Sequence, residues 1–295
     1  MKNENDVKIL AGVVLFNPDS SVFENIKKIV NIPEIDLIFI YDNSNYSNES
    51  KIVEDKKIVY YSEYDNKGIA YALKKIMSYA IANKFTYVLT LDQDSVVSNL
   101  NGIKELLSCN SDYAILTLNY NKKYNSSKPV KNVKYVISSG NFINVEKYKQ
   151  IKGFNEDLFI DYVDFDLCYQ FHEIKSKIGV CVKYFMQHTI GTPMVKKIAF
   201  LKIKSFNHSP IRYYYRYRNE LYCFKRSRLF FLKLHIKEKI RIILMLIVEK
   251  NTNEKMKMIK LGRKDAKKNK LGKYDGSVLW KQVLLWLHLI LKNSF

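Results

Sequence analysis

The chain has 295 residues, of which 47% are hydrophobic and 26% are charged, a composition that excludes disorder over most of its length. Its formal net charge is +20, and residues 201–295 hold most of this excess, with 24 Lys and Arg against 6 Asp and Glu. This asymmetry indicates a polyanionic partner, which the charge alone leaves open as substrate phosphates, an anionic membrane surface or a nucleic acid.

The first hundred residues alternate between strand-like and helix-like segments. Near-continuous apolar runs predict buried strands over residues 7–16, 36–41, 58–61 and 87–91. Helical spacing of apolar side chains predicts helices over residues 22–29 and 68–82. This rhythm favours an α/β fold with a doubly wound, mostly parallel sheet. Such sheets bind ligands beyond the carboxyl ends of their strands, and here polar clusters follow the strands at Asn17, Asp42 and Asp92.

Beyond residue 200 the sequence changes to basic, amphipathic helical segments, so we expect a catalytic α/β domain over 1–200 and a helical region over 201–295. The two clearest helices are expected over 229–248 and 278–291. The second carries one narrow polar stripe, and either packing on the core or lying in a membrane interface explains it. In the second case, Trp280 and Trp286 would sit among the lipid headgroups.

Three observations bear on the compartment. The four cysteines are widely spaced without a CxxC pair, which favours free thiols in a reducing environment. The polar, acidic start of the chain does not resemble a secretory signal. The longest uncharged apolar stretch near the end, 282–291, is shorter than the roughly 20 residues that span a bilayer. We therefore expect a cytoplasmic protein, peripheral on the inner face of the cell membrane.

Asp92 and Asp94 form an Asp-x-Asp pair at the end of a predicted buried strand. In an extended chain, residues i and i+2 project to the same side, so both carboxylates can face one ligand. Two neighbouring anions are unfavourable unless a cation lies beside them. A hard cation such as Mg²⁺ or Mn²⁺, shared with a diphosphate, removes that repulsion. A surface turn is the plainer alternative for an isolated pair.

A second acidic cluster, Asp161, Asp164 and Asp166, follows an apolar run and leads into a predicted helix. Asp164 is placed to open that helix, where the helix dipole favours a carboxylate. A carboxylate beside an acceptor pocket can take the proton of an attacking hydroxyl, so Asp164, with Asp161 beside it, is the candidate catalytic group. At least one of the three is expected to be a helix cap. His188, after a predicted strand over 180–185, is either structural or a metal ligand beside Asp94.

The motifs together resemble a bacterial family 2 glycosyltransferase of GT-A fold, and most closely the rhamnosyltransferase subgroup. The matching stretches run through most of the chain: 14–18, 42–44, 66–70, 89–95, 139–140, 159–164, 188–191, 209–214 and 218–219. The Leu-Asp-Gln-Asp-Ser stretch (91–95) and the Phe-Ile-Asp-Tyr-Val-Asp stretch (159–164) are the most specific to that subgroup.

The resemblance implies a role for each matching position. Donor binding is implied for Phe16, Asn17, Asp42, Asn66, Gly68, Asp92, Ser139, Gly140, Arg212, Arg218 and Asn219. Within this set, Asn17 and Asp42 would line the base and ribose pocket, and Ser139 and Gly140 would border the donor sugar. Arg212, Arg218 and Asn219 would approach the diphosphate or the lipid-phosphate end. Metal binding is implied for Asp92, Asp94 and His188, and base catalysis for Asp164. The reaction would be one displacement with inversion at the anomeric carbon.

Two positions depart from the family pattern. Lys74 stands where the family often has Asn, which puts a ribose contact in doubt. Gln170 stands where an Arg usually follows the catalytic Asp by six residues, so the acidic cluster lacks an expected partner.

The resemblance implies a nucleotide-sugar donor, dTDP-rhamnose, and a lipid-linked or saccharide acceptor for a surface polysaccharide. A UDP-hexose or galactofuranose donor is the alternative within the same fold. A nucleotidyltransferase is disfavoured because the loop after the first strand, 16–19, has neither glycine nor positive charge. A nucleic-acid binder could stack bases on the tyrosines between Arg212 and Arg218, but no recognition module is present and no nucleic acid is expected.

Overall fold

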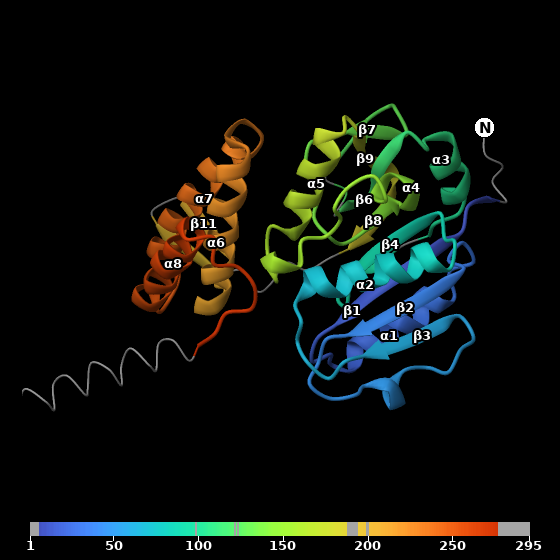
Figure 1. Ribbon diagram of the computed structural model, residues 1–295, viewed down its shortest axis with the longest axis horizontal. Helices are drawn as coiled ribbons and strands as arrows, with labels where there is room; N and C mark the ends of the chain where they lie inside the picture. Colours follow the sequence, from blue (N-terminus) through green and yellow to red (C-terminus); the bar gives the residue numbers. More distant parts are fainter. Residues whose placement is uncertain are drawn as a thin grey trace, which may run out of the picture.

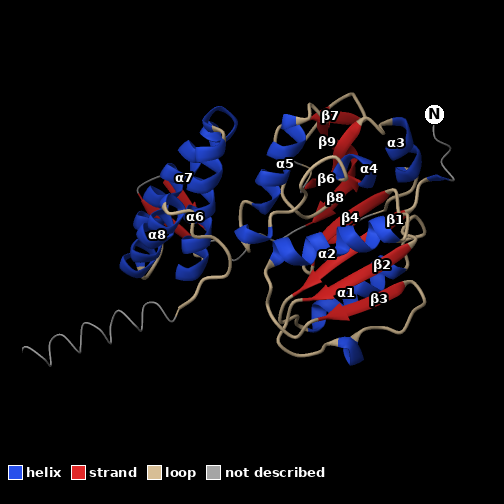
Figure 2. Cartoon of the chain, in the orientation of Figure 1, coloured by secondary structure: helices blue, strands red, loops and turns tan. Residues whose placement is uncertain are grey.

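A computed structural model describes residues 6–97, 99–120, 122, 124–187, 194–198 and 201–276. A large sheet with helices on both faces occupies the first part of the chain, and three long helices stand beside it (Figures 1 and 2). The expected helix over 278–291 and the candidate metal ligand His188 lie outside the described residues.

The first half of the sheet is parallel, as expected from the strand–helix rhythm. Its order is β3-β2-β1-β4, and all three ladders are parallel. The strands are β1 (Ile9–Leu15), β2 (Leu37–Asp42), β3 (Ile58–Ser62) and β4 (Tyr87–Asp92). Each strand lies within two residues of its predicted bounds, because each is an apolar run ended by turn-forming residues.

The second half of the sheet is mixed. Strand β8 (Asn141–Asn144) runs antiparallel to both β4 and β6 (Tyr113–Tyr120), and β6 is parallel to β9 (Lys177–Gln187). Two short strands, β5 (Val96–Val97) and β7 (Val130–Asn132), pair antiparallel with β9. The doubly wound α/β prediction is confirmed, with the parallel ladders concentrated in the half predicted to bind the nucleotide.

Helices cover both faces of the sheet because side chains along its strands alternate between two apolar clusters. Leu10 and Val14 of β1 face one cluster, with α2 (Ile69–Ala82), α4 (Val145–Tyr148) and α5 (Val163–Glu173). Ile9 and Val13 face the other, with α1 (Ser20–Val30) and α3 (Ile103–Cys109). Two short 3₁₀ turns, η2 (Glu49–Lys51) and η3 (Glu156–Leu158), complete this part.

The rest of the described chain forms a helical unit, residues 194–276. It begins with an antiparallel hairpin, β10 (Met194–Ile198) and β11 (Leu201–Ser205). Three helices follow: α6 (Pro210–Arg226), α7 (Arg228–Val248) and α8 (Thr252–Lys267). Helix α7 matches the helix expected over 229–248. The expected boundary at residue 200 falls between the two strands of the hairpin, so the helical unit begins earlier than predicted.

The helical unit shares its apolar core with the sheet-bearing part. Phe230 and Phe231 of α7 are buried against Tyr169 of α5, with ring centroids 5.2 and 5.5 Å apart. The four cysteines are free, as expected; Cys168, Cys181 and Cys223 are buried, and Cys109 is exposed. Among the residues that the structure describes, no helix is both long and apolar enough to cross a membrane.

Candidate active site

The carboxyl ends of the parallel strands bring the first predicted donor-binding residues together. Parallel register places Leu15 beside Asp42 and Val14 beside Asp92. Just beyond, the Phe16 amide donates to Gln93 Oε1 at 2.8 Å, and the Asn17 amide donates to Ser44 Oγ at 2.8 Å. Phe16 and Asn17 are exposed, so a surface for a flat ring lies directly beside the Asp-x-Asp loop.

Asp42 does not line this surface. Its side chain is fully buried, and its Oδ1 accepts from the Ser44 amide at 3.0 Å. Its Oδ2 accepts from Asn48 Nδ2 and the Tyr60 hydroxyl, each at 2.8 Å. The expected contact between Asp42 and the donor base or ribose is incompatible with this burial. Asp42 instead fixes the loop after β2, and thereby Ser44 and Asn17.

Asn66 and Gly68 join the start of α2 to the loop that precedes the acidic cluster. Asn66 Oδ1 accepts from the Gly68 amide at 2.9 Å and from Asn43 Nδ2 at 3.1 Å. Gly68 has a φ of +88°, and a Cβ there would lie 2.6 Å from the carbonyl oxygen of Phe159. Only glycine permits this backbone conformation and this close approach. These two residues position the chain around Phe159.

Ser139 and Gly140 form hydrogen bonds with the end of β4 and the start of the Asp-x-Asp loop. The Asp92 amide donates to Ser139 Oγ at 3.0 Å, and the Gly140 amide donates to Thr90 O at 2.7 Å. Ser139 is only 1% exposed and also bonds Ser95 Oγ at 2.6 Å, so it cannot border a donor sugar with its side chain. Its role in this structure is to fix the main chain at Asp92.

Removal of the Ser139 hydroxyl is expected to loosen this loop. Ser139→Ala breaks the bonds to the Asp92 amide and to Ser95, and each such bond contributes about 0.5–1.5 kcal/mol. We expect a loss of about 1–2 kcal/mol in the free energy of unfolding, measured by urea denaturation, and a higher KM for the donor. Ser78→Ala is the control, because the Ser78 hydroxyl bonds only the carbonyl of Lys74 within its own helix. An unchanged KM in Ser139→Ala would contradict this role.

The two carboxylates of the loop suit a divalent cation by their chemistry. Asp94 is exposed, and Asp92 is half-buried two residues before it. Oxygen ligands of this kind are what Mg²⁺ and Mn²⁺ accept, with the remaining positions left to water and substrate phosphates. Within the described ranges, no group of three or more His, Cys, Asp or Glu side chains is assembled to hold an ion. By the chemistry of their oxygens, Asp92 and Asp94 fit a divalent cation.

A short segment connects the Asp-x-Asp loop with the acidic cluster. Tyr135 packs edge-on against Phe165, with ring centroids 5.9 Å apart, and Phe165 directly follows Asp164. Ser139, four residues beyond Tyr135, holds the Asp92 amide. Four residues of extended chain span at most about 14 Å. Phe159, four residues before α5, accepts from the amide of Ala70 in the first turn of α2, which follows the carboxyl end of β3. The start of α5 therefore lies at the same end of the sheet as the Asp-x-Asp loop, which follows the carboxyl end of β4.

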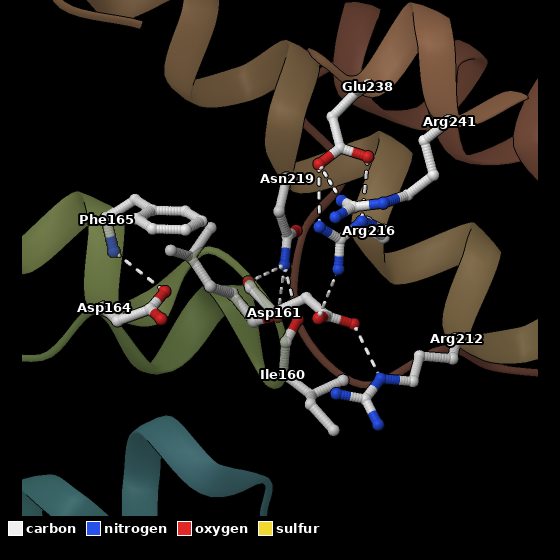
Figure 3. A network of polar contacts seen from close by, with 10 residues as sticks. Ile160, Asp161, Asp164, Phe165, Arg212, Arg216, Asn219, Glu238 and Arg241 are labelled. Atoms are coloured by element: carbon white, nitrogen blue, oxygen red, sulfur yellow. Dashed lines mark hydrogen bonds and ion pairs between the residues drawn. The ribbon is translucent and has the colours of Figure 1, made fainter. Parts of the chain in front are cut away.

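Asp164 lies in the first turn of α5 and is separate from the arginines around it (Figure 3). Its Oδ1 accepts from the Phe165 amide at 2.9 Å. Burial raises the pKa of Asp164 to about 7, and the negative charge of Asp161 adds to that rise. A carboxylate with a pKa near 7 can both hold and release a proton at neutral pH, as a general base must.

Asp161 has a different environment, although it is only three residues away. It is ion-paired with Arg212 at 3.2 Å and with Arg216 at 3.3 Å (Figure 3). Burial favours a higher pKa, but the charges of the two arginines outweigh it and hold the pKa of Asp161 below its ordinary value. The lowered pKa makes Asp161 a weaker base than Asp164, and its two ion pairs hold the start of α5 against α6.

Arg218 and Asn219 are fully buried and hold the main chain before the acidic cluster. Arg218 donates to the carbonyls of Asp157, Leu158 and Gly272 at 2.6–3.1 Å. Asn219 Nδ2 donates to the carbonyls of Leu158, Ile160 and Asp161 at 2.8–2.9 Å. The expected contact of Arg218 and Asn219 with the donor diphosphate is incompatible with this geometry. Arg212, whose side chain is 43% exposed, is the member of that predicted set that reaches the surface.

Gln170 stands where the family usually has an arginine, and in this structure an arginine from another helix pairs with the acidic cluster instead. Asp166 is 1% exposed and forms an ion pair with Arg226, at the end of α6. Gln170 Nε2 donates to Asp166 Oδ2 and to the carbonyl of Gly153, each at 2.8 Å. At the other departure from the family pattern, Lys74 forms an ion pair with Glu156 at 2.7 Å. Sequence reasoning identified the missing arginine but not its substitute, which is distant in sequence.

Comparisons with known proteins bear on the fold and on the family resemblance. A search against protein-family models finds no match. The chain is 26% identical over 278 residues to the dTDP-rhamnosyl transferase RfbF of Shigella flexneri, covering 84% of this chain and 92% of that protein. The structure is similar to that of GalNAc-T7 with UDP, GalNAc and Mn²⁺, with a TM-score of 0.57 and 11% identity. That alignment covers 76% of this chain but only 48% of the other.

The structural likeness concerns the fold, because the sequences are too different to carry more. The sequence likeness extends over most of both chains. The chain has the GT-A fold, and its resemblance to family 2 glycosyltransferases of the rhamnosyltransferase subgroup is confirmed.

Proposed function

We propose that this chain transfers a sugar, L-rhamnose from dTDP-rhamnose, to an acceptor hydroxyl with inversion at the anomeric carbon. The observation that carries the proposal is Asp164, a carboxylate with a pKa of about 7 at the same end of the sheet as the Asp92–Asp94 loop. A displacement of this kind needs a base for the incoming hydroxyl and charge compensation for the departing diphosphate. The likeness to RfbF supports the choice of donor.

Each residue at the site has a task in this proposal. Phe16 and Asn17 offer an exposed surface for the nucleoside, and Asp92 and Asp94 would hold Mg²⁺ or Mn²⁺ against the diphosphate. A bound divalent ion neutralises charge on the leaving nucleotide. Asp164 accepts the proton of the acceptor hydroxyl while that oxygen attacks the sugar carbon. Arg212, half-exposed beside Asp161, is a cation that could reach a phosphate of the donor.

The donor is tested by incubating the full chain with dTDP-rhamnose, UDP-hexoses and UDP-galactofuranose, with and without EDTA. The nucleoside diphosphate released from each donor is measured. We expect release of dTDP from dTDP-rhamnose and its loss with EDTA. Release of UDP alone would move the proposal to the UDP-hexose or galactofuranose donor. No release from any of these donors, with a range of acceptors, would reject the function.

Asp94→Asn is expected to lower the affinity for the divalent cation. It should leave the stability of the fold unchanged, because Asp94 is exposed. Loss of one anionic ligand lowers the affinity of a hard cation. We expect the Mn²⁺ concentration for half-maximal activity to rise at least about tenfold, the lower end of what a disturbed metal site typically shows. Asp112→Asn, an exposed carboxylate paired with Lys177, is the control. The same metal dependence in Asp94→Asn and the parent chain would contradict the assignment.

The acceptor in this proposal is a saccharide, free or lipid-linked, presented at the inner face of the cell membrane. The net charge of +20 supports a partner with an anionic surface. The alternative of a nucleic-acid binder loses its main support in the structure. The tyrosines that could have stacked bases, Tyr213, Tyr214, Tyr215 and Tyr217, are 0–5% exposed. Binding to oligonucleotides in place of anionic vesicles would revive that alternative.

A further inference from the structure

Helix α7 has two different faces. One face is buried against the rest of the protein through Phe230, Phe231, Leu234, Met245 and Val248. At 100° per residue, these positions lie on one side of the helix. The same face includes Glu238, which is 1% exposed and paired with Arg216 and Arg241. This face packs α7 both against the sheet-bearing part and against α6 and α8.

The opposite face of α7 is apolar and exposed. Its side chains recur every three or four residues, so they form one stripe along five turns of the helix. The stripe consists of Leu229 (85% exposed), Leu232 (46%), Ile236 (52%), Ile240 (52%), Ile243 (57%) and Leu246 (49%). These six account for a large part of the exposed large apolar side chains in the described residues. A contiguous exposed apolar stripe of this length marks an interaction surface.

Positive charges border the stripe on both sides. Lys233 lies along one edge of the stripe, while Arg228 and Lys239 lie along the other. Glu238 is the single acidic residue of α7, and it lies on the buried face. The exposed half of the helix is therefore an apolar strip between two basic edges, without a compensating carboxylate of its own.

We propose that this face of α7 lies on an anionic lipid bilayer. The apolar stripe would enter the boundary between headgroups and acyl chains, while the lysines and arginine at its edges contact lipid phosphates. Such an arrangement matches a helix that lies in the membrane plane, which agrees with the absence of a spanning helix in the described residues. The inference rests on the proposed function in one respect, namely that the acceptor is held at a membrane.

The charges beside the stripe favour a membrane over two other partners that could cover it, namely a second copy of this chain and the segment 277–295. A second copy of this chain would bring the same basic edges against those of the first. The segment 277–295 is apolar enough to cover the stripe, but it carries Lys281 and Lys292 and no acidic residue. Both occupants would place like charges together, whereas anionic lipid complements Lys233, Arg228 and Lys239.

The test is co-sedimentation of the full chain with vesicles of phosphatidylcholine alone and of phosphatidylcholine with phosphatidylglycerol at roughly 3:1. We expect binding to the anionic vesicles that falls as salt is raised. Ile236→Glu combined with Ile240→Glu should weaken this binding at least about tenfold, because carboxylates enter the interface poorly. Lys233→Gln with Lys239→Gln should weaken binding to anionic vesicles and leave the weak binding to neutral vesicles unchanged.

Ile81→Glu is the matched control, since Ile81 is an exposed isoleucine near the end of another helix, α2. It should bind vesicles as the parent chain does. Release of nucleoside diphosphate without vesicles should be the same in all these variants, which separates failure of this inference from failure of the proposed function. Equal vesicle binding by the double Glu variant and the parent chain would overturn the inference.

Two measurements without lipid exclude the other occupants. Both tryptophans of the chain, Trp280 and Trp286, lie in the segment 277–295, so their emission reports on that segment alone. The inference predicts the same emission and the same mass by sedimentation equilibrium for the parent chain and the double Glu variant. A change in emission would assign the stripe to the segment 277–295, and a change in mass would assign it to a second copy. Either change would overturn the inference.

Discussion

Asp164→Asn is expected to lower kcat by roughly 10²–10⁴, the usual contribution of a general base, while leaving affinity for the donor nearly unchanged. The amide keeps the size of the carboxylate and can still accept from the Phe165 amide, so the start of α5 should keep its shape. It cannot take the proton of an attacking hydroxyl. Turnover and donor binding are measured separately, by nucleoside diphosphate release and by equilibrium binding of the nucleotide sugar.

The pH dependence follows from the raised pKa. With a pKa of about 7, Asp164 is protonated and inactive in acid, so turnover should rise as the pH increases through about 7. Stability should change in the opposite direction. A carboxyl whose pKa is raised on folding stabilises the fold below its unfolded pKa and loses that contribution as the pH rises through its folded pKa. Asp164→Asn should therefore be at least as stable as the parent chain at pH 8.

This combination separates catalysis from folding. An inactive variant with an equal or higher free energy of unfolding at pH 8 supports Asp164 as the base. Asp157→Asn is a suitable control, since Asp157 is an exposed carboxylate that precedes the same segment. A variant of Asp164 that turns over at nearly the parent rate would show that another group accepts the proton.

The fold could be predicted from sequence because local signals agreed with one another. The run Ile9–Leu15 is apolar throughout and ends at a turn, and Asp19 caps α1 by accepting from the Ser21 amide. The start of the helical unit was harder to predict from the sequence. Strands β10 and β11 are short, alternate with lysines and lack a tight-turn motif, so nothing in their composition distinguishes them from a linker.

The roles of several candidate site residues could not be predicted from the sequence. Motif matching singled out Asp42, Asp161 and Arg218, but the environment of each depends on neighbours that are far away in sequence. Arg218 reaches Asp157 across about 60 residues, and Asp161 meets Arg212 across about 50. Burial converts these three residues from contacts with a ligand into supports of the main chain. Spacing along a chain contains no signal for such burial.

The ion-pair network connected to Asp161 was also missed from the sequence, because its members are far apart along the chain. Arg216 bridges Asp161 at 3.3 Å and Glu238 at 2.7 Å, and Arg241 also contacts Glu238 (Figure 3). Glu238 is 1% exposed at its side chain, and the two arginines hold its pKa below the ordinary value against the effect of burial. The network thus joins α7 to the start of α5, next to the candidate base.

Glu238→Ala is expected to cost about 3–5 kcal/mol in the free energy of unfolding, because it leaves the buried charge of Arg216 with one partner in place of two. Denaturation in guanidinium chloride measures the loss. Glu238→Gln keeps an acceptor for Arg216 and should cost less. Glu24→Ala, which breaks an exposed pair with Lys27, should cost at most about 1 kcal/mol. Equal losses in Glu238→Ala and Glu24→Ala would contradict a supporting network.

The pH dependence of this network has the opposite sign to that of Asp164. A carboxyl whose pKa is lowered on folding stabilises the fold above its unfolded pKa, and that contribution is lost as the pH falls through the folded value. The stability difference between the parent chain and Glu238→Ala should therefore be large at pH 7 and shrink in acid. Because Arg216 also holds Asp161, a surviving folded fraction of Glu238→Ala should show a lower kcat. An unchanged kcat would mean that the start of α5 keeps its geometry without the support of α7.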